Sequence, residues 1–171
     1  MRALKTITDA LSKAALVLAA TILIYSVAHI LLETVLRSVF ATSTYVLDEF
    51  IGFAILSITF LSLAWTLRTG SMIRVMLITD VLPGWARRAA EFVVSATACV
   101  LVTSGCVFFF HNFLKDWQRG AVSESIAEVP LWIPGLVVVV GASLLALQLF
   151  VRSLAVLLGE MDAESEAGEV L

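Results

Sequence analysis

The feature that most constrains this chain is its four long apolar stretches. They cover residues 14–36, 50–67, 92–110 and 133–151. A helix needs roughly 20 mostly apolar residues to cross a hydrocarbon core of about 30 Å, so each stretch is a candidate span. Charged residues make up only 15% of the chain, against about a quarter in soluble domains. The sequence therefore predicts an all-α fold, an integral membrane four-helix bundle.

The parts of the chain outside the spans are short. We assign residues 1–155 to the membrane domain and residues 156–171 to a cytoplasmic tail. The tail is acidic and is predicted to be solvated and disordered. The first apolar stretch is longer than the core of a cleaved signal peptide, so we expect it to be retained.

The Lys and Arg residues predict the orientation of the spans, because cytoplasmic loops carry an excess of both. Eight fall on the side of the termini, and three fall on the other side. The eight are Arg2, Lys5, Lys13, Arg68, Arg74, Arg87, Arg88 and Arg152, and the three are Arg37, Lys115 and Arg119. Both termini are therefore expected in the cytoplasm.

The connection at residues 70–88 is expected to lie on the cytoplasmic face. Its first part is mostly apolar but is interrupted by Arg74 and Asp80, and it is too short to span. Pro83 and Gly84 then indicate a turn. We predict a short interfacial segment here, lying flat between spans two and three.

Ionisable residues gather near the outer ends of spans one and two. Glu33 precedes Arg37 by one helical turn, which suits an ion pair. Asp48 and Glu49 open span two, where the positive end of the helix dipole favours acids. Arg37 could pair with any of the three acids. The group is interpreted as polar contacts between helices, with docking of another protein or catalytic carboxylates as alternatives.

Motifs for other chemistry are missing from the sequence. It contains no GxSxG, HExxH or phosphate-binding loop, and no Cys/His cluster for zinc. Basic residues are few and follow the topology, so nucleic-acid binding has no support. One cofactor alternative stays open: His29 and His111 near the outer ends of spans one and three could ligate a haem, as in a membrane anchor of a respiratory complex.

Three elements in order carry a family resemblance. Arg37 follows span one, and the pair Asp48–Glu49 opens span two. Residues 63–83 read LAWTLRTGSMIRVMLITDVLP, and residues 125–135 read SIAEVPLWIPG. Together they resemble the small, Q-type membrane subunit of tripartite ATP-independent periplasmic (TRAP) transporters, over roughly residues 10–155. The LRSVF end of span one and the acidic tail depart from the family pattern.

The resemblance implies a passive partner in secondary transport in the bacterial inner membrane. Such a subunit scaffolds a large multi-span subunit, and a periplasmic binding protein delivers an organic acid for sodium-driven uptake. The substrate and sodium sites are expected in the large subunit, so no enzyme activity, catalytic residue, cofactor or metal is assigned here. The candidate structural or interface residues are Glu33, Arg37, Asp48, Glu49, Arg68, Arg74, Pro130 and Trp132.

Overall fold

Four α-helices make up most of the computed structural model, which describes residues 2–69 and 83–157. They are α1 (Arg2–Phe40), α2 (Leu47–Arg68), α3 (Gly84–Arg119) and α4 (Trp132–Leu157). All four are long and apolar enough to cross a membrane. The predicted all-α membrane fold is therefore confirmed.

Two of the helices are much longer than a bilayer requires. α1 has 39 residues and α3 has 36, which at the usual rise makes them about 58 Å and about 54 Å long. A hydrocarbon core is only about 30 Å thick. Both helices must therefore tilt or extend past the hydrocarbon at one end, which the apolar stretches alone did not indicate.

The start of α3 corrects one prediction. The N–H groups of Ala86 and Arg87 bond to the carbonyl of Pro83 at 2.8 and 3.0 Å, and Pro83 is the N-cap with an extended backbone. Pro suits the beginning of a helix because its missing N–H is not needed there. Residues 84–88 thus begin α3 and are not part of a separate interfacial segment. The rest of that segment, residues 70–82 with Arg74, lies outside the described residues.

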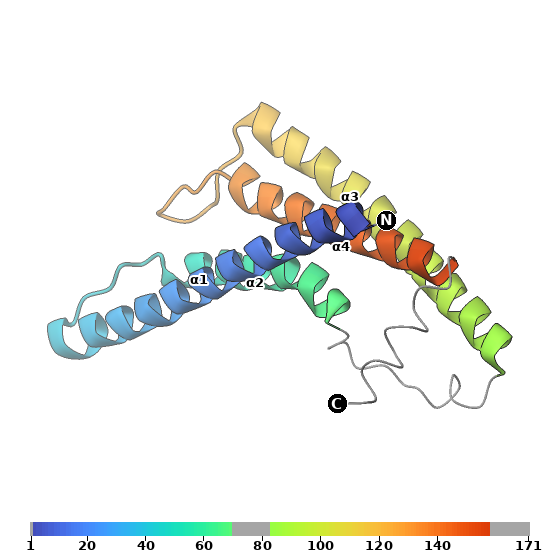
Figure 1. Cartoon of the computed structure of the whole chain (residues 1–171). Coiled ribbons are helices and arrows are strands. Elements are labelled where there is room, and N and C mark those ends of the chain that lie inside the picture. The colour runs from blue at the N-terminus through green and yellow to red at the C-terminus, as the bar shows by residue number, and fades with distance from the viewer. Residues whose placement is uncertain (1, 70–82, 158–171) are drawn as a thin grey trace, which may run out of the picture.

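The helices pack in the order α1, α2, α4, α3 (Figure 1). α1 packs on α2, α2 on α4 and α4 on α3, with a smaller contact between α1 and α4. Figure 1 shows two antiparallel pairs crossing obliquely, with the connections 41–46 and 120–131 on the same side. We call that side the outer end and the opposite side the cytoplasmic end, following the charge-based orientation.

Small residues form the contact where the two helix pairs cross. Ala15, Ala19 and Leu61 are buried together between α1 and α2, beside residues of α4. At Gly141 the backbones of α4 and α2 come very close, because a Cβ built there would lie 2.6 Å from the carbonyl oxygen of Phe60. Close approach through small residues is the usual way in which helices associate in lipid.

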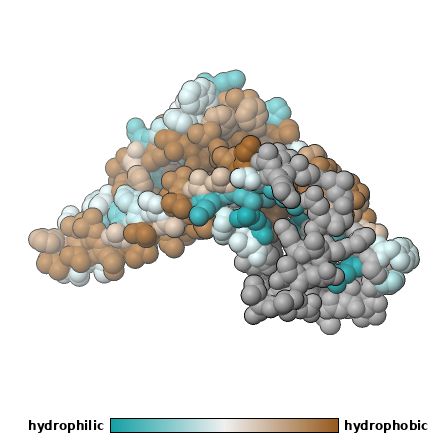
Figure 2. Space-filling model, in the orientation of Figure 1, coloured by the Kyte–Doolittle hydropathy of each residue, from teal (hydrophilic) through white to brown (hydrophobic). Residues whose placement is uncertain are grey.

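The outer flanks of the molecule are apolar. Among the coloured residues, Figure 2 shows hydrophobic ones over much of the upper and left parts of the molecule, with a hydrophilic group in the middle of this face. In the most apolar part of α3 only 6% of residues are buried, and in that of α1 only 17%. Both helices therefore present wide apolar surfaces to their surroundings.

Candidate functional site

The outer end of α1 holds a buried carboxylate with several partners. Glu33 is 1% exposed, and Arg37 Nε donates to its Oε1 at 2.8 Å. The hydroxyl of Ser43 donates to the same oxygen. Thr44 donates to Oε2 through its N–H at 3.1 Å and its hydroxyl at 2.7 Å. We call these four residues the Glu33 clamp.

The Glu33 clamp fixes the connection between α1 and α2. Two residues of that connection, Ala41 and Tyr45, have φ angles of 49° and 59°. L-residues adopt this left-handed region only when surrounding contacts compensate for its cost. Since Ser43 and Thr44 lie between them and both bond to Glu33, the buried carboxylate supplies those contacts. The sequence predicted the Glu33–Arg37 pair but not the two hydroxyl residues.

Arg37 also faces outward. Its side chain is 57% exposed, and its Nη2 reaches the Ser43 hydroxyl at 3.3 Å. It borders an open cavity of about 480 Å³, which Ala41, Thr42 and Tyr45 also line. Tyr45 is 71% exposed. A guanidinium with five N–H donors, beside hydroxyl groups, can accept a carboxylate from another molecule.

The other two outer acids do not join the Glu33 clamp. Glu49 Oε2 accepts a hydrogen bond from the hydroxyl of Ser125, whereas its Oε1 is buried without a hydrogen-bond partner in the described part of the chain. Asp48 is exposed. Both border a cavity of about 530 Å³ between α2, α3 and α4 that also contains Asn112 and Asp116. Of the three possible partners for Arg37, the structure selects Glu33.

The connection at 120–131 folds back on itself above α3 and α4. Ser123 N–H bonds to the carbonyl of Val129 at 2.9 Å, next to the isolated bridge between Val122 and Pro130. Trp132 then begins α4, and its ring lies 4.8 Å from that of Trp117 in an edge-to-face contact. The predicted residues Pro130 and Trp132 thus lie where this connection joins the bundle.

The cytoplasmic end holds a second polar group, in which only Arg68 was predicted. Arg68 Nε lies 2.5 Å from Asp9 Oδ1, and its guanidinium lies over the ring of Trp65, 5.1 Å from the centroid. Deeper in the bundle, Gln148 Nε2 donates to Ser12 Oγ at 3.0 Å, with both residues buried. These contacts join α1 to α2 and α4.

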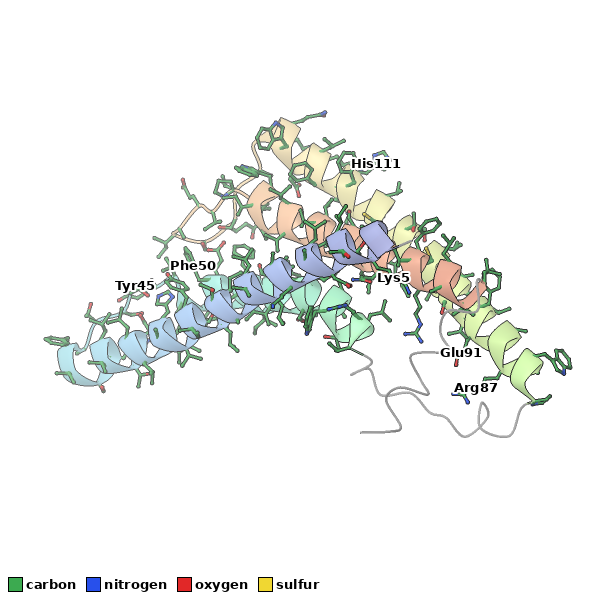
Figure 3. All side chains as sticks on the ribbon, in the orientation of Figure 1. Lys5, Tyr45, Phe50, Arg87, Glu91 and His111 are labelled. Carbon is green, nitrogen blue, oxygen red and sulfur yellow. The ribbon has the colours of Figure 1, made fainter. Side chains whose placement is uncertain are left out.

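The structure does not bring the two histidines together. His29 on α1 lies 5.8 Å from the ring of Tyr25 and 6.1 Å from that of Phe50. His111 is exposed on α3, and Figure 3 shows it projecting away from α4. α1 packs mainly on α2 and α3 mainly on α4. The haem alternative required histidines on facing helices, and that premise was wrong.

Within residues 2–69 and 83–157, no group of three or more His, Cys, Asp or Glu residues is placed to hold a metal ion. The two half-buried cysteines, Cys99 and Cys106, contact α4 through backbone oxygens and Ser143. These contacts place both thiols at the packing surface between α3 and α4.

Comparison with known proteins gives one family. The family described as the DctQ component of tripartite ATP-independent periplasmic transporters matches residues 26–159. A search of curated proteins gave no match. The matched range contains the Glu33 clamp, the connection at 120–131 and all of α2 and α4.

Proposed function

This chain belongs to the DctQ family, the small component of TRAP transporters, and from this premise we propose that it scaffolds the large membrane subunit of such a system. In this proposal the large subunit moves the substrate, and this chain holds it in place in the bacterial inner membrane. Transport is coupled to sodium, and the substrate is an organic acid that a periplasmic binding protein delivers. Sodium and substrate bind to the large subunit.

The observation that carries the proposal is the exposed apolar surface of the two outermost helices. Ile24 on α1 is 72% exposed and Val100 on α3 is 68% exposed. Monomeric soluble proteins rarely expose wide apolar patches, and in a membrane such surfaces face lipid or another protein. Because α1 and α3 terminate the packing order, a larger subunit can seat against either one without displacing another helix.

A second part of the proposal concerns the outer end. The exposed guanidinium of Arg37 and the ring of Tyr45 face outward from a connection that Glu33 holds in one conformation. Rigid polar and aromatic groups of this kind are typical of protein contact surfaces. We propose that they help dock an acidic patch of the binding protein while it transfers its ligand.

Uptake measurements test whether the large subunit transports the substrate and this chain supports it. Cells carrying the complete three-component system should take up a labelled organic acid in sodium medium and lose that uptake in potassium medium. Omitting this chain should abolish uptake and reduce the recovered large subunit. Sodium-dependent uptake by liposomes containing this chain alone would overturn the scaffold role.

Photocrosslinking tests the contact surface. A photoreactive phenylalanine analogue at Ile24 or Val100 should crosslink to the large subunit from at least one position. The matched control is Trp85, which is 77% exposed on α3 but lies at its cytoplasmic end. Crosslinks from Trp85 but from neither of the other two positions would contradict the proposed seating.

A further inference from the structure

The cavity beside Asp48 and Glu49 is a groove between α2 and α3. Both helices pack on α4, but within the described residues they barely touch each other, so α4 forms the floor of the groove. The volume is about 530 Å³, within the range of about 300–1,000 Å³ that ligand sites occupy. We call this cavity the α2–α3 groove. The scaffold role by itself gives it no occupant.

The α2–α3 groove is closed at both ends and open along one side. At the outer end the connection at 120–131 reaches the start of α2 (Figure 1), where the hydroxyl of Ser125 donates to Glu49. At the inner end the rings of Phe60 and Phe109 meet edge to face, with their centroids 5.8 Å apart. Because α4 forms the floor, the open side faces away from α4, into the membrane around the helices. A partner embedded in the membrane therefore has more direct access than a soluble one.

The outer part of the α2–α3 groove is charged and the inner part is apolar. Asp48 and Glu49 lie in the first turn of α2, and Asp116 lies in the last turn of α3. Farther in, Leu56 of α2 and Phe109 of α3 line the groove. Lys and Arg side chains have the same order of groups, because a charged end follows an apolar stem.

The acids of the α2–α3 groove have no cationic partner. Its lining residues include no Lys, Arg or His, and within the described part of the chain Asp48, Glu49 and Asp116 form no ion pair. Arg37 attracts Asp48, but its own ion pair is with Glu33. One oxygen of Glu49 is buried without a hydrogen-bond partner among the described residues. Unpaired carboxylates create a negative potential that favours a cation.

The outer end as a whole is acidic. It comprises residues 33–49 and 111–131, all of them described, which contain six acidic and three basic residues. Two of the bases, Lys115 and Arg119, are exposed and do not line the groove. In the described ranges no three or more His, Cys, Asp or Glu residues are placed to hold a metal ion. The carboxylates therefore suit a larger cation with several N–H donors, such as a guanidinium or an ammonium group.

We propose that the α2–α3 groove receives a Lys or Arg side chain from a membrane helix of the large subunit. This inference rests on the proposed scaffold role and adds the kind of side chain that the partner supplies. The stem of that side chain lies along the apolar inner part, and its charged end reaches the carboxylates at the outer end. A base in a membrane helix needs such a partner, because an unpaired charge at membrane depth is costly.

The first test is binding of the labelled chain to the purified large subunit in detergent. Asp48→Asn/Asp116→Asn removes two charges from the groove and keeps the size of both side chains. We expect the Kd to rise about tenfold, between the small effect of losing an exposed ion pair and the large effect of losing a buried one. The matched control Glu124→Gln/Glu128→Gln removes the same charge from exposed residues outside the groove and should bind like the parent protein.

The outcomes of this test separate the groove from the scaffold role. If the parent protein binds the large subunit and the groove variant binds it equally well, the groove holds no base, although the scaffold role stands. An equal loss of affinity in the groove variant and the control also overturns the proposal, because it would show a general effect of charge. A parent protein that does not bind the large subunit refutes the scaffold role and this inference together.

The second test identifies the occupant in a chain whose acids are all retained. A photoreactive phenylalanine analogue replaces Phe53, which lines the groove, or, as a control, Phe150, which is 49% exposed on α4 outside the groove. The peptide crosslinked from position 53 should come from a membrane helix of the large subunit and contain Lys or Arg, whereas position 150 should not give this peptide. A peptide without a basic residue, a peptide of the binding protein, or crosslinks to lipid alone would each contradict the proposal.

Discussion

Gly141 offers the sharpest test of how α2 and α4 pack. A Cβ at this position would lie 2.6, 2.7 and 2.8 Å from the carbonyl oxygen, carbonyl carbon and Cβ of Phe60. Nonbonded carbon atoms settle at about 3.5–4.0 Å. Two of the three atoms belong to the backbone of α2, so the overlap cannot be relieved by turning a side chain. Gly141→Ala must therefore push the two helices apart by roughly 1 Å.

The cost of that displacement can be placed between two limits. Inserting a methyl group into a packed core costs about 1–3 kcal/mol. Against this, replacing Gly by Ala within a helix favours the helix by about 0.5–1 kcal/mol. The clash involves three atoms of one residue, so we take the overpacking cost from the upper half of its range. Gly141→Ala is then expected to lower the free energy of unfolding by about 1–2.5 kcal/mol.

Two other glycines provide matched controls. A Cβ at Gly52 on α2 or Gly105 on α3 would meet no atom within 4 Å. Gly52→Ala and Gly105→Ala therefore retain the helix gain without a clash and should leave stability unchanged or raise it by up to about 1 kcal/mol. Unfolding is followed by far-UV circular dichroism while SDS is added to protein in a mild detergent. If Gly141→Ala unfolds at the same SDS fraction as Gly105→Ala, the close contact between α2 and α4 does not exist.

Three further predictions concern polar and aromatic contacts. Arg37→Ala should reduce recovery of the complex with the large subunit, measured by co-purification. Arg37→Glu should reduce recovery further, because it puts a second acid beside the buried Glu33. Equal recovery for Arg37→Glu and the parent protein would show that the Glu33–Arg37 pair has no role in assembly. Ser12→Ala leaves the buried Gln148 amide without its partner and should cost about 1–2 kcal/mol in the SDS assay. Adding Gln148→Leu should restore part of that loss, and strictly additive effects would show that the hydrogen bond is absent. Trp132→Ala should lower the free energy of unfolding by about 0.5–1.5 kcal/mol beyond the loss from reduced burial, because it removes the ring contact with Trp117. Trp132→Phe should retain much of that stability. A Phe variant as unstable as the Ala variant would argue against the edge-to-face contact.

The sequence predicted those features that depend on local composition. Apolar length is sufficient to find four membrane helices, and one-turn spacing is sufficient to pair Glu33 with Arg37. The helix bounds were less accurate, because α1 and α3 continue past their apolar stretches into polar surroundings. The residues after Pro83 illustrate this. Arg87 and Glu91 lie outside the third apolar stretch, yet both belong to α3, and Arg87 Nε lies 3.6 Å from Glu91 Oε1.

The packing order could not be predicted, and the reason is physical. In a soluble helix bundle the polar face of each helix is exposed to solvent, so the sequence shows which face packs. In lipid both the packed face and the exposed face of a helix are apolar. Nothing local indicates that α2 meets α4 rather than α3. Contacts between residues far apart in the sequence were missed for the same reason. The Asp9–Arg68 pair and the Ser12–Gln148 hydrogen bond can be identified only when the relative positions of the helices are known.

The positions of the polar contacts explain how so open an arrangement of helices holds together. Charge at membrane depth is costly, and the cost falls toward the interfaces. The Glu33 clamp accordingly lies at the outer end and the Asp9–Arg68 pair at the cytoplasmic end. Between them, contact depends on small residues around Gly141, on the Ser12–Gln148 hydrogen bond and on the thiol contacts of Cys99 and Cys106 with α4. Because these polar contacts lie near the helix ends, the exposed flanks of α1 and α3 between them remain apolar, as at Ile24 and Val100.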